Sequence, residues 1–237
     1  MTLPPDARTA LLGVTTATLT TVLLKKGLRN CWIRGAMPLT GAAQGNRVVG
    51  EAFTLRFVPM REDLATPASW GNPISTRAAI EAMPEGVIAV TDAMGVTEAG
   101  IFGDILCARM AVRKVAALVT DGVLRDLAGV EQTGLPVWAQ GTAAPASIAG
   151  LTFVGWNEPI ACGGVAVFAG DVIVADTDGA VVIPSAMVAD VVAAAVEQEA
   201  MEAWILREAQ SGVPLPGLYP MNAETKARYD AFRAGKG

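Results

Sequence analysis

Histidine is absent from all 237 residues of the chain. This absence excludes Ser-His-Asp and Cys-His nucleophilic systems, histidine-based zinc sites and imidazole acid–base chemistry. Any catalysis by this protein must therefore use carboxylates, guanidinium groups, lysine, hydroxyls or a hard metal ion.

Cysteine is scarce, and no two cysteines stand in a CxxC spacing. The three thiols, Cys31, Cys107 and Cys162, lie among apolar or small neighbours. Isolated cysteines in such surroundings usually pack as small hydrophobic side chains. The pattern predicts a reducing, cytoplasmic location.

Long apolar runs and basic clusters are also missing. No segment reaches the ~18 uninterrupted apolar residues of a membrane helix, and the start from Met1 to Arg8 does not resemble a signal peptide. The formal net charge is −5 and the basic residues are scattered, so no basic patch is available to bind a phosphate backbone. We expect a soluble protein that binds neither membrane nor nucleic acid.

Charged residues are few, at 17%, whereas hydrophobic residues make up 52% of the chain. Such a composition is apolar for a monomer. It predicts a homo-oligomer in which other subunits cover part of the surface.

Alternating helical and strand patterns fill the first two thirds of the chain. Apolar periodicity predicts helices over residues 6–26, 75–83 and 104–113, and short apolar runs predict strands over residues 47–58, 86–91, 116–120 and 136–140. This order indicates an α/β fold with a mostly parallel sheet, whose ligand sites lie at the carboxyl ends of the strands. The most polar turn, Asp121-Gly122, follows one such strand.

The last third has a different pattern. Residues 165–184 predict two or three strands joined by tight turns. A long amphipathic helix is expected from Pro184-Ser185 to Gln210, followed by a polar tail from Pro214. We therefore expect one domain over residues 1–237, with residues 185–237 forming a C-terminal helix and tail.

The segment Gly103–Gly129 concentrates the candidate chemistry. Asp104 starts a predicted helix, where free backbone N–H groups favour anions, and the pair Arg125-Asp126 follows the next strand. Arginine binds carboxylates bidentately, and Mg²⁺ needs only one or two protein carboxylates. Spacing alone also allows a plain interpretation, in which Arg125-Asp126 is a solvated turn and Asp104 an N-cap.

The sequence resembles the RraA-like family, which includes 4-hydroxy-4-methyl-2-oxoglutarate and 4-carboxy-4-hydroxy-2-oxoadipate aldolases. The resemblance is carried by an acidic residue, twenty intervening residues and then Arg-Asp, which Asp104, Arg125 and Asp126 satisfy. It continues through Val119 to Gly122 and through Cys162 to Pro184, and covers roughly residues 45–215.

The resemblance implies a helix sandwich around a central mixed β-sheet or barrel, like a swivelling domain, with a long C-terminal helix. It also implies a class II pyruvate aldolase in which Asp126 binds Mg²⁺ or Mn²⁺ and Arg125 contacts the keto and enolate oxygens. The helix start at Gly103 would present the backbone amides of Ile105 and Leu106 to the pyruvyl carboxylate. Asp104 would orient the water that moves the proton.

Family members are trimers or dimers of trimers, and a neighbouring subunit supplies an acidic residue to the site. Glu199 and Glu202 on the C-terminal helix are the candidates here. Two departures from the family concern the distal end of the substrate: residues 141–150 contain no basic residue, and the insert around residues 61–70 is longer than in the simplest members. The substrate is therefore open between an aromatic-degradation oxo acid and a 2-keto-3-deoxy sugar acid.

Three other functions remain open. A class I aldolase would need a buried lysine, but Lys114 is expected to be a solvated cation at the end of a helix. A non-catalytic member of the family would bind and regulate a ribonuclease, although such members lack the full Asp104, Arg125 and Asp126 pattern. An oxaloacetate decarboxylase would need the same enolate stabilisation as the aldolase.

Overall fold

The strand β3 connects the two halves of the sheet. The protein is described by a computed structural model over residues 3–235. β3 spans Val48–Pro59; its first half pairs antiparallel with β10 (Val172–Asp176) and its second half pairs parallel with β4 (Ile88–Asp92). The antiparallel strand β9 (Leu151–Trp156) completes the other side of its second half. The sheet is therefore mixed.

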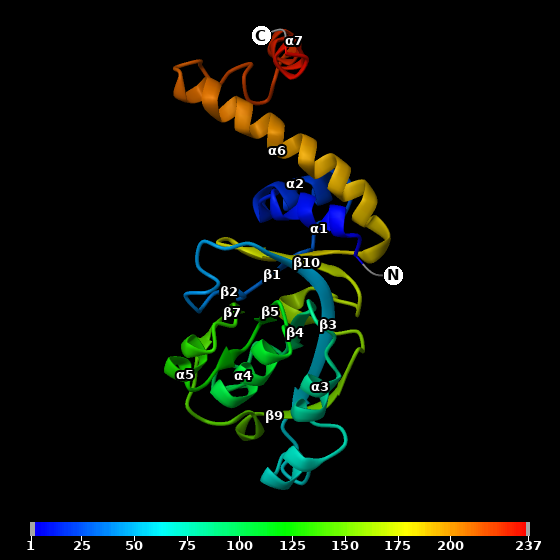
Figure 1. Ribbon diagram of the computed structural model, residues 1–237, viewed down its shortest axis with the longest axis vertical. Coiled ribbons are helices and arrows are strands. Elements are labelled where there is room, and N and C mark those ends of the chain that lie inside the picture. Colours follow the sequence, from blue (N-terminus) through cyan, green and yellow to red (C-terminus); the bar gives the residue numbers. More distant parts are fainter. Residues whose placement is uncertain (1–2, 236–237) are drawn as a thin grey trace.

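The main sheet has nine strands in the order β1-β11-β10-β3-β4-β5-β7-β2, with β9 branching from β3. Its remaining members are β1 (Trp32–Ile33), β2 (Met37–Pro38), β5 (Ala117–Thr120), β7 (Val137–Ala139) and β11 (Gly179–Ile183). β11 and β2, close to opposite ends of this order, contact each other. The sheet therefore curls into a half-barrel around its inner face (Figure 1).

Three short helices cover the outer face of the parallel strands. They are α3 (Thr76–Ala82), α4 (Asp104–Val112) and α5 (Leu127–Gln132). Alternation along β3 directs Phe53, Leu55 and Phe57 to the same core as these helices, as expected for a strand whose successive side chains point to opposite faces. This layer places the start of α4 beside the start of α5.

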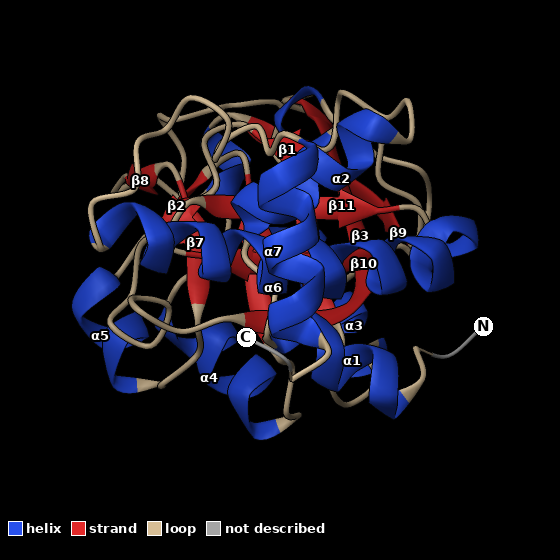
Figure 2. Ribbon diagram, turned by 90° about the horizontal axis from the view of Figure 1, so that it is seen from above, coloured by secondary structure: helices blue, strands red, loops and turns tan. Residues whose placement is uncertain are grey.

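A second core fills the inside of the half-barrel, where Ile88, Val90 and Val119 meet Ile173 and Val182. A third core lies on the outside of β10 and β11, beneath α1 (Pro5–Leu12), α2 (Thr16–Lys25) and α6 (Val188–Gln210). Figures 1 and 2 show α6 crossing over α1 and α2 and extending beyond them. Between Pro184 and α6 lies a short 3-10 turn, Ser185–Met187.

Several sequence predictions are confirmed and others need correction. The fold class, the four predicted strands and the helices α3, α4 and α6 are present. Residues 6–26 do not form one helix, because Gly13 ends α1 and the Thr15 side chain caps α2 by accepting the Thr18 N–H. Residues 165–184 form two strands, in agreement with the two or three that were predicted.

The polar tail contains a helix that was not predicted, α7 (Ala223–Arg233). Asn222 caps α7 by accepting the Thr225 N–H at 2.8 Å, and the ring of Tyr229 packs 5.5 Å from Trp204 of α6. Among residues 3–235 no single helix is long and apolar enough to cross a membrane; α1 and α2 meet that test only together, as a pair bent by 112°.

Candidate active site

The candidate residues Asp104 and Arg125 lie on the same cavity because two short segments run side by side. After β4 the chain passes through Gly100 to Phe102 and lies along β6 (Val123–Leu124). The Ile101 N–H donates to the Val123 carbonyl at 2.9 Å, and the Arg125 N–H donates to the Phe102 carbonyl at 3.0 Å. β6 is held on its other side by β8 (Gly141–Thr142). These contacts place the end of β6 beside the start of α4.

Both candidate acidic residues lie at helix starts. Gly103 is the extended N-cap of α4, so Asp104 occupies its first turn. Asp126 is the N-cap of α5 and has left-handed backbone angles, φ 56° and ψ 40°. Left-handed residues other than glycine are uncommon and concentrate at functional sites. The backbone thus turns sharply between Arg125 and α5 and keeps both side chains on one cavity.

A cavity of about 210 Å³ is lined by every residue that the sequence predicted for the site. These are Gly103, Asp104, Ile105, Leu106, Arg125 and Asp126. The structure thus brings the predicted residues together in one place, which we call the lyase cavity. Their individual roles remain predictions.

Two glycines make this close arrangement possible. A Cβ at Gly103 would lie 2.6 Å from Oδ2 of Asp126, and a Cβ at Gly129 would lie 2.7 Å from Oδ2 of Asp104. Contacts this short would force the carboxylates to move. Each acidic side chain therefore lies against the glycine of the other segment.

Asp104 binds the first turn of its own helix. Its Oδ1 accepts the Ile105 N–H at 2.7 Å, and the Ile105 side chain is 79% exposed. The amide predicted to bind a substrate carboxylate is thus already paired with a carboxylate. An incoming anion at this amide would have to replace Asp104 Oδ1.

Arg125 and Asp126 form a partly exposed ion pair. The Arg125 Nε donates to Asp126 Oδ2 at 3.0 Å, and the two side chains are 37% and 44% exposed. Solvent screens such a pair, so its contribution to stability is small. Its value is geometric, because it holds the guanidinium and the carboxylate on the same cavity.

The oxygen donors present fit a magnesium-type ion better than zinc. No group of three His, Cys, Asp or Glu residues is positioned to hold a metal within residues 3–235. Mg²⁺ retains several waters and is often bound by only one or two carboxylates. Asp126, which lines the cavity, would provide that kind of donor set together with water.

Sequence reasoning missed other residues that line the lyase cavity, among them the aromatic and polar side chains Trp70, Thr76, Arg77 and Ser147. The Arg77 guanidinium lies over the Trp70 ring, 5.0 Å from its centre, which is a favourable cation–π distance. The available signal was the insert at residues 61–70, whose last residue is Trp70. Helical periodicity marks Arg77 only as an exposed position, so it gave no signal.

The polar turn after β5 has a structural role. The Asp121 carboxylate is buried and accepts the N–H groups of Ala93, Gly95 and Gly163 at 2.8, 3.1 and 3.0 Å. Burial raises the pKa of Asp121, and the carboxylate of Asp92 adds to that effect, whereas the three hydrogen bonds oppose it. Asp121 therefore ties three loops together at the carboxyl ends of β4 and β5.

Two other potentially reactive side chains, Lys114 and Cys107, do not line the lyase cavity. Lys114 pairs with Glu85 at 3.0 Å and is 69% exposed, which does not suit a Schiff-base lysine. Burial, assisted by the carboxylate of Asp104, raises the pKa of Cys107 to about 12, so this thiol stays protonated at neutral pH. The surroundings of Lys114 and Cys107 therefore indicate structural roles for both residues.

Glu199 and Glu202 lie on α6 and bind α2 of the same chain. The Glu199 Oε2 accepts the Thr15 N–H, and the Glu202 Oε2 accepts the Thr18 hydroxyl, each at 3.2 Å. Both residues also line a shallow hollow near the end of α6. Within one chain they serve to attach α6 to α2.

Known proteins are similar to this chain in sequence and in fold. Residues 16–182 match the RraA-like family described as Aldolase/RraA. A Halalkalibacterium halodurans protein, provisionally named as a 4-hydroxy-4-methyl-2-oxoglutarate aldolase, is 34% identical over 158 residues, which are 66% of this chain and 69% of that protein.

Solved structures agree with that match. A Streptomyces coelicolor protein, described as an unusual member of the RNase ES inhibitor RraA protein family, is 33% identical with a TM-score of 0.76, covering 86% of this chain and 97% of the other. An uncharacterized protein from Pseudomonas syringae pv. tomato shares the fold at 24% identity with a TM-score of 0.77, covering 92% and 99%. The chain belongs to the Aldolase/RraA family of RraA-like proteins.

Proposed function

We propose that this protein is a metal-dependent class II aldolase that cleaves a 2-oxo-4-hydroxy acid to pyruvate and a second carbonyl compound. The observation that carries the proposal is the lyase cavity, where the guanidinium of Arg125 and the carboxylates of Asp104 and Asp126 line one space at the starts of α4 and α5. The provisional name of the Halalkalibacterium relative supports the same reaction class.

The pyruvyl end of the substrate would bind at the start of α4. Free N–H groups at a helix N-terminus favour anions, and the candidates here are the amide of Leu106 and that of Ile105, which in the structure donates to Asp104 Oδ1. A substrate carboxylate would take the place of Asp104 Oδ1 on the Ile105 amide. That exchange would free Asp104 to act on a water molecule.

Cleavage begins when the C4 hydroxyl loses its proton. Asp104 would orient the water that accepts this proton, which is general base catalysis through one water. The C3–C4 bond then breaks, and its electron pair passes to the pyruvate enolate. Arg125 would stabilise the enolate oxygen with N–H groups other than the Nε that already binds Asp126, because donors aimed at developing charge lower the barrier.

Asp126 is the residue that would hold Mg²⁺ or Mn²⁺, together with water. A divalent ion bound there would supply additional positive charge to the 2-oxo group. Gly103 leaves space for the Asp126 carboxylate on this cavity. We expect no zinc dependence, because the chain has no histidine and its cysteines are buried.

A pyruvate-release assay tests the proposal. The purified protein would be given a panel of 2-oxo-4-hydroxy acids and oxaloacetate, before and after exhaustive chelation with EDTA and after Mg²⁺ or Mn²⁺ is restored. We expect release that disappears with EDTA and returns with the metal. Full activity after chelation would rule out the metal-dependent mechanism. Release from oxaloacetate would show decarboxylase activity in the same cavity, since both reactions form pyruvate enolate.

The alternative is a non-catalytic protein that binds a ribonuclease. The Streptomyces relative, described as belonging to the RNase ES inhibitor RraA family, favours this second function. Retention of Asp104, Arg125 and Asp126 on one cavity favours catalysis. If no 2-oxo acid is cleaved, a pull-down with an RNase E-type ribonuclease becomes the deciding experiment.

We also propose a homo-oligomer, with three subunits or a multiple of three. Large apolar side chains near the end of α6 are more than half exposed, namely Leu206, Leu215 and Tyr219. They surround the hollow that contains Glu199 and Glu202, so a neighbour could cover this face. Light scattering that shows an active monomer at assay concentration would contradict the assembly.

A further inference from the structure

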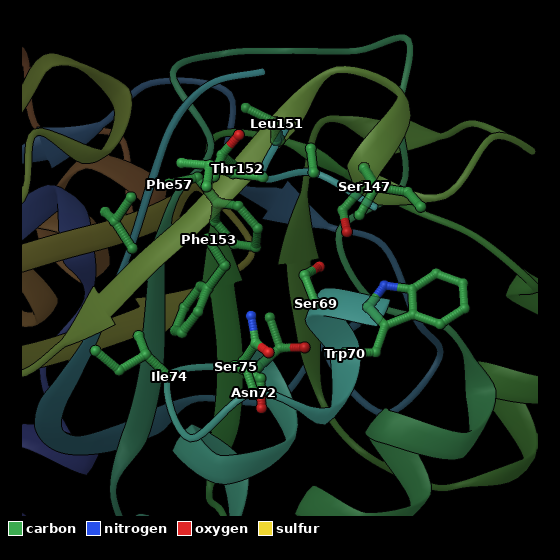
Figure 3. Close-up of a pocket in the computed structure, with 15 residues that line it drawn as sticks. Phe57, Ser69, Trp70, Asn72, Ile74, Ser75, Ser147, Leu151, Thr152 and Phe153 are labelled. Atoms are coloured by element: carbon green, nitrogen blue, oxygen red, sulfur yellow. The ribbon is translucent and has the colours of Figure 1, made fainter. Parts of the chain in front are cut away.

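A second cavity, of about 350 Å³, lies directly beside the lyase cavity. The two share Trp70, Thr76 and Ser147 as common walls. The second cavity is enclosed by the end of β3, the segment after it, the 3-10 turn Ser147–Ala149 and β9. We call it the side chamber. Figure 3 shows Trp70 and Phe153 on opposite sides of it, with Ser69 between them.

The chamber lining carries no ionisable group. Its fifteen lining residues, all within the described range 3–235, are apolar, aromatic, hydroxyl or amide side chains. Three of its hydroxyls already bind backbone: Ser69 donates to the Thr66 carbonyl, while Ser75 and Thr152 accept the N–H groups of Ala78 and Arg61. A charged group entering the chamber would find no counter-ion in its lining.

Aromatic side chains form part of the chamber wall. Phe57 and Phe153 lie edge to face with their ring centres 5.2 Å apart, and Trp70 closes the side toward the lyase cavity. Small-molecule pockets have volumes of about 300–1,000 Å³, and a cavity of roughly 150 Å³ can hold benzene. The chamber is therefore large enough for a phenyl ring.

Charge is segregated across Trp70. The Arg77 guanidinium lies over the Trp70 ring at 5.0 Å and lines the lyase cavity, not the chamber. The lyase cavity also contains Arg125, Asp104 and Asp126. The charged side chains that could bind an ionised 2-oxo acid therefore line the lyase cavity, whereas the chamber is lined by neutral side chains.

We propose that the side chamber binds the C4 substituent of the substrate and selects a neutral, apolar group there, such as an aryl ring. This inference rests on the proposed lyase function. Cleavage removes the C4 hydroxyl proton, breaks the C3–C4 bond, leaves the electron pair on pyruvate enolate, which takes a proton at C3, and releases C4 as an apolar aldehyde. The segment after β3, with Leu64, Trp70 and Ile74, determines this preference.

Two substrates that differ only at C4 test the proposal. They are 4-hydroxy-2-oxo-4-phenylbutanoate, which would give benzaldehyde, and 4-hydroxy-2-oxopentanedioate, which would give glyoxylate; pyruvate from both would be quantified by chromatography. We expect kcat/KM to be at least about tenfold higher for the phenyl compound, since apolar pockets discriminate on the order of 10–200-fold for small differences.

Two variants place a cation in the chamber. Leu64→Arg and Ile74→Arg change side chains that are 48% and 56% exposed, so neither change buries a charge in the core. Each should lower the phenyl-to-carboxylate ratio of kcat/KM at least about tenfold. The control is Leu12→Arg, which adds the same charge at a leucine that is 43% exposed on α1 and should leave the ratio unchanged.

The outcomes separate this inference from the proposed function. A wild-type preference for the dicarboxylate, or a ratio that neither chamber variant alters, would overturn the chamber assignment and leave the aldolase standing. If oxaloacetate is decarboxylated but neither hydroxy acid is cleaved, the chamber assignment is likewise overturned. If no 2-oxo acid releases pyruvate, the proposed function and this inference both fall.

Discussion

Gly103 lies so close to Asp126 that a Cβ at residue 103 would come within 2.6 Å of Asp126 Oδ2. The two residues are 23 positions apart in sequence, and they come together because the segment before α4 pairs with β6. The same added Cβ would lie 3.3 Å from Cγ of Arg125. Gly103 thus sets how near the Arg125-Asp126 pair lies to the start of α4.

Gly103→Ala should therefore damage the site more than the fold. Its backbone is extended, so alanine adopts it without strain, while the carboxylate of Asp126 is displaced. We expect kcat/KM for pyruvate release to fall on the order of tenfold or more, because small misplacements of catalytic groups are costly. Gly41→Ala is the control, since its Cβ would meet only Glu131 Oε2 at an ordinary 3.6 Å. Equal activity of both variants would contradict the assignment.

Arg125→Lys should lose most of kcat, on the order of 10²-fold, because a point charge cannot replace a guanidinium fork. In the structure Nε binds Asp126, which leaves the terminal nitrogens for substrate. A lysine offers one nitrogen for both tasks. Arg233→Lys is the control, since Arg233 is a partly exposed arginine of α7 that also pairs with a carboxylate, that of Glu197. Steady-state kinetics would measure both, and unchanged kcat would exclude Arg125 from the chemistry.

Substitutions at Asp126 and Asp104 should impair the enzyme in different ways. Asp126→Ala should abolish metal-dependent activity and metal binding, which isothermal titration with Mg²⁺ would measure. Asp104→Asn should keep metal binding while kcat falls, since an amide cannot assist proton transfer through water. If the Asp104→Asn variant also failed to bind Mg²⁺, the separate roles assigned to Asp104 and Asp126 would be wrong. Asp230→Asn, on α7, is the control for loss of one surface carboxylate.

The sequence predicted the centre of the site because that centre is local. Asp104, Arg125 and Asp126 all lie within 23 consecutive residues, and their neighbours have clear strand or helix patterns. The strands β3, β4 and β5 were predicted for the same reason, since they are apolar runs bounded by turn residues. What the sequence could not show is that the segment at Gly100 would pair with β6.

The side chamber escaped prediction because irregular segments build it. Trp70 belongs to the 3-10 turn Pro67–Gly71, and Ser147 to another such turn. Short 3-10 turns have no apolar period to detect. The insert itself was visible in the sequence, but which cavity it borders depends on tertiary packing.

The bend after α1 was missed although its signals are present. Gly13 and Thr15 are a helix stop and a helix cap, and the apolar stripe continuing into α2 concealed them. The helix α7 was missed because its residues are mostly polar. It is stabilised by one packed face, where Tyr229 contacts Trp204 and donates to Glu197 at 2.9 Å.

Asp121→Asn should destabilise the fold, even though it removes a buried charge. The Asp121 Oδ2 accepts two N–H groups, from Gly95 and Gly163. An amide can offer its oxygen to one side only, so at least one buried N–H would face another donor. We expect the free energy of unfolding to drop by about 1–3 kcal/mol, as measured by urea denaturation at neutral pH.

The pH dependence of the free energy of unfolding, compared between the wild type and Asp121→Asn, gives a second check. Because burial raises the pKa of Asp121 above 3.8, the folded protein binds this proton more tightly than the unfolded chain does. Protonation of Asp121 therefore favours folding as pH falls through its folded-state pKa toward 3.8. The asparagine variant lacks this contribution, so the wild-type advantage in free energy of unfolding should widen over that range. A constant difference between the two proteins from neutral pH to pH 4 would show that the carboxyl does not titrate as its burial requires.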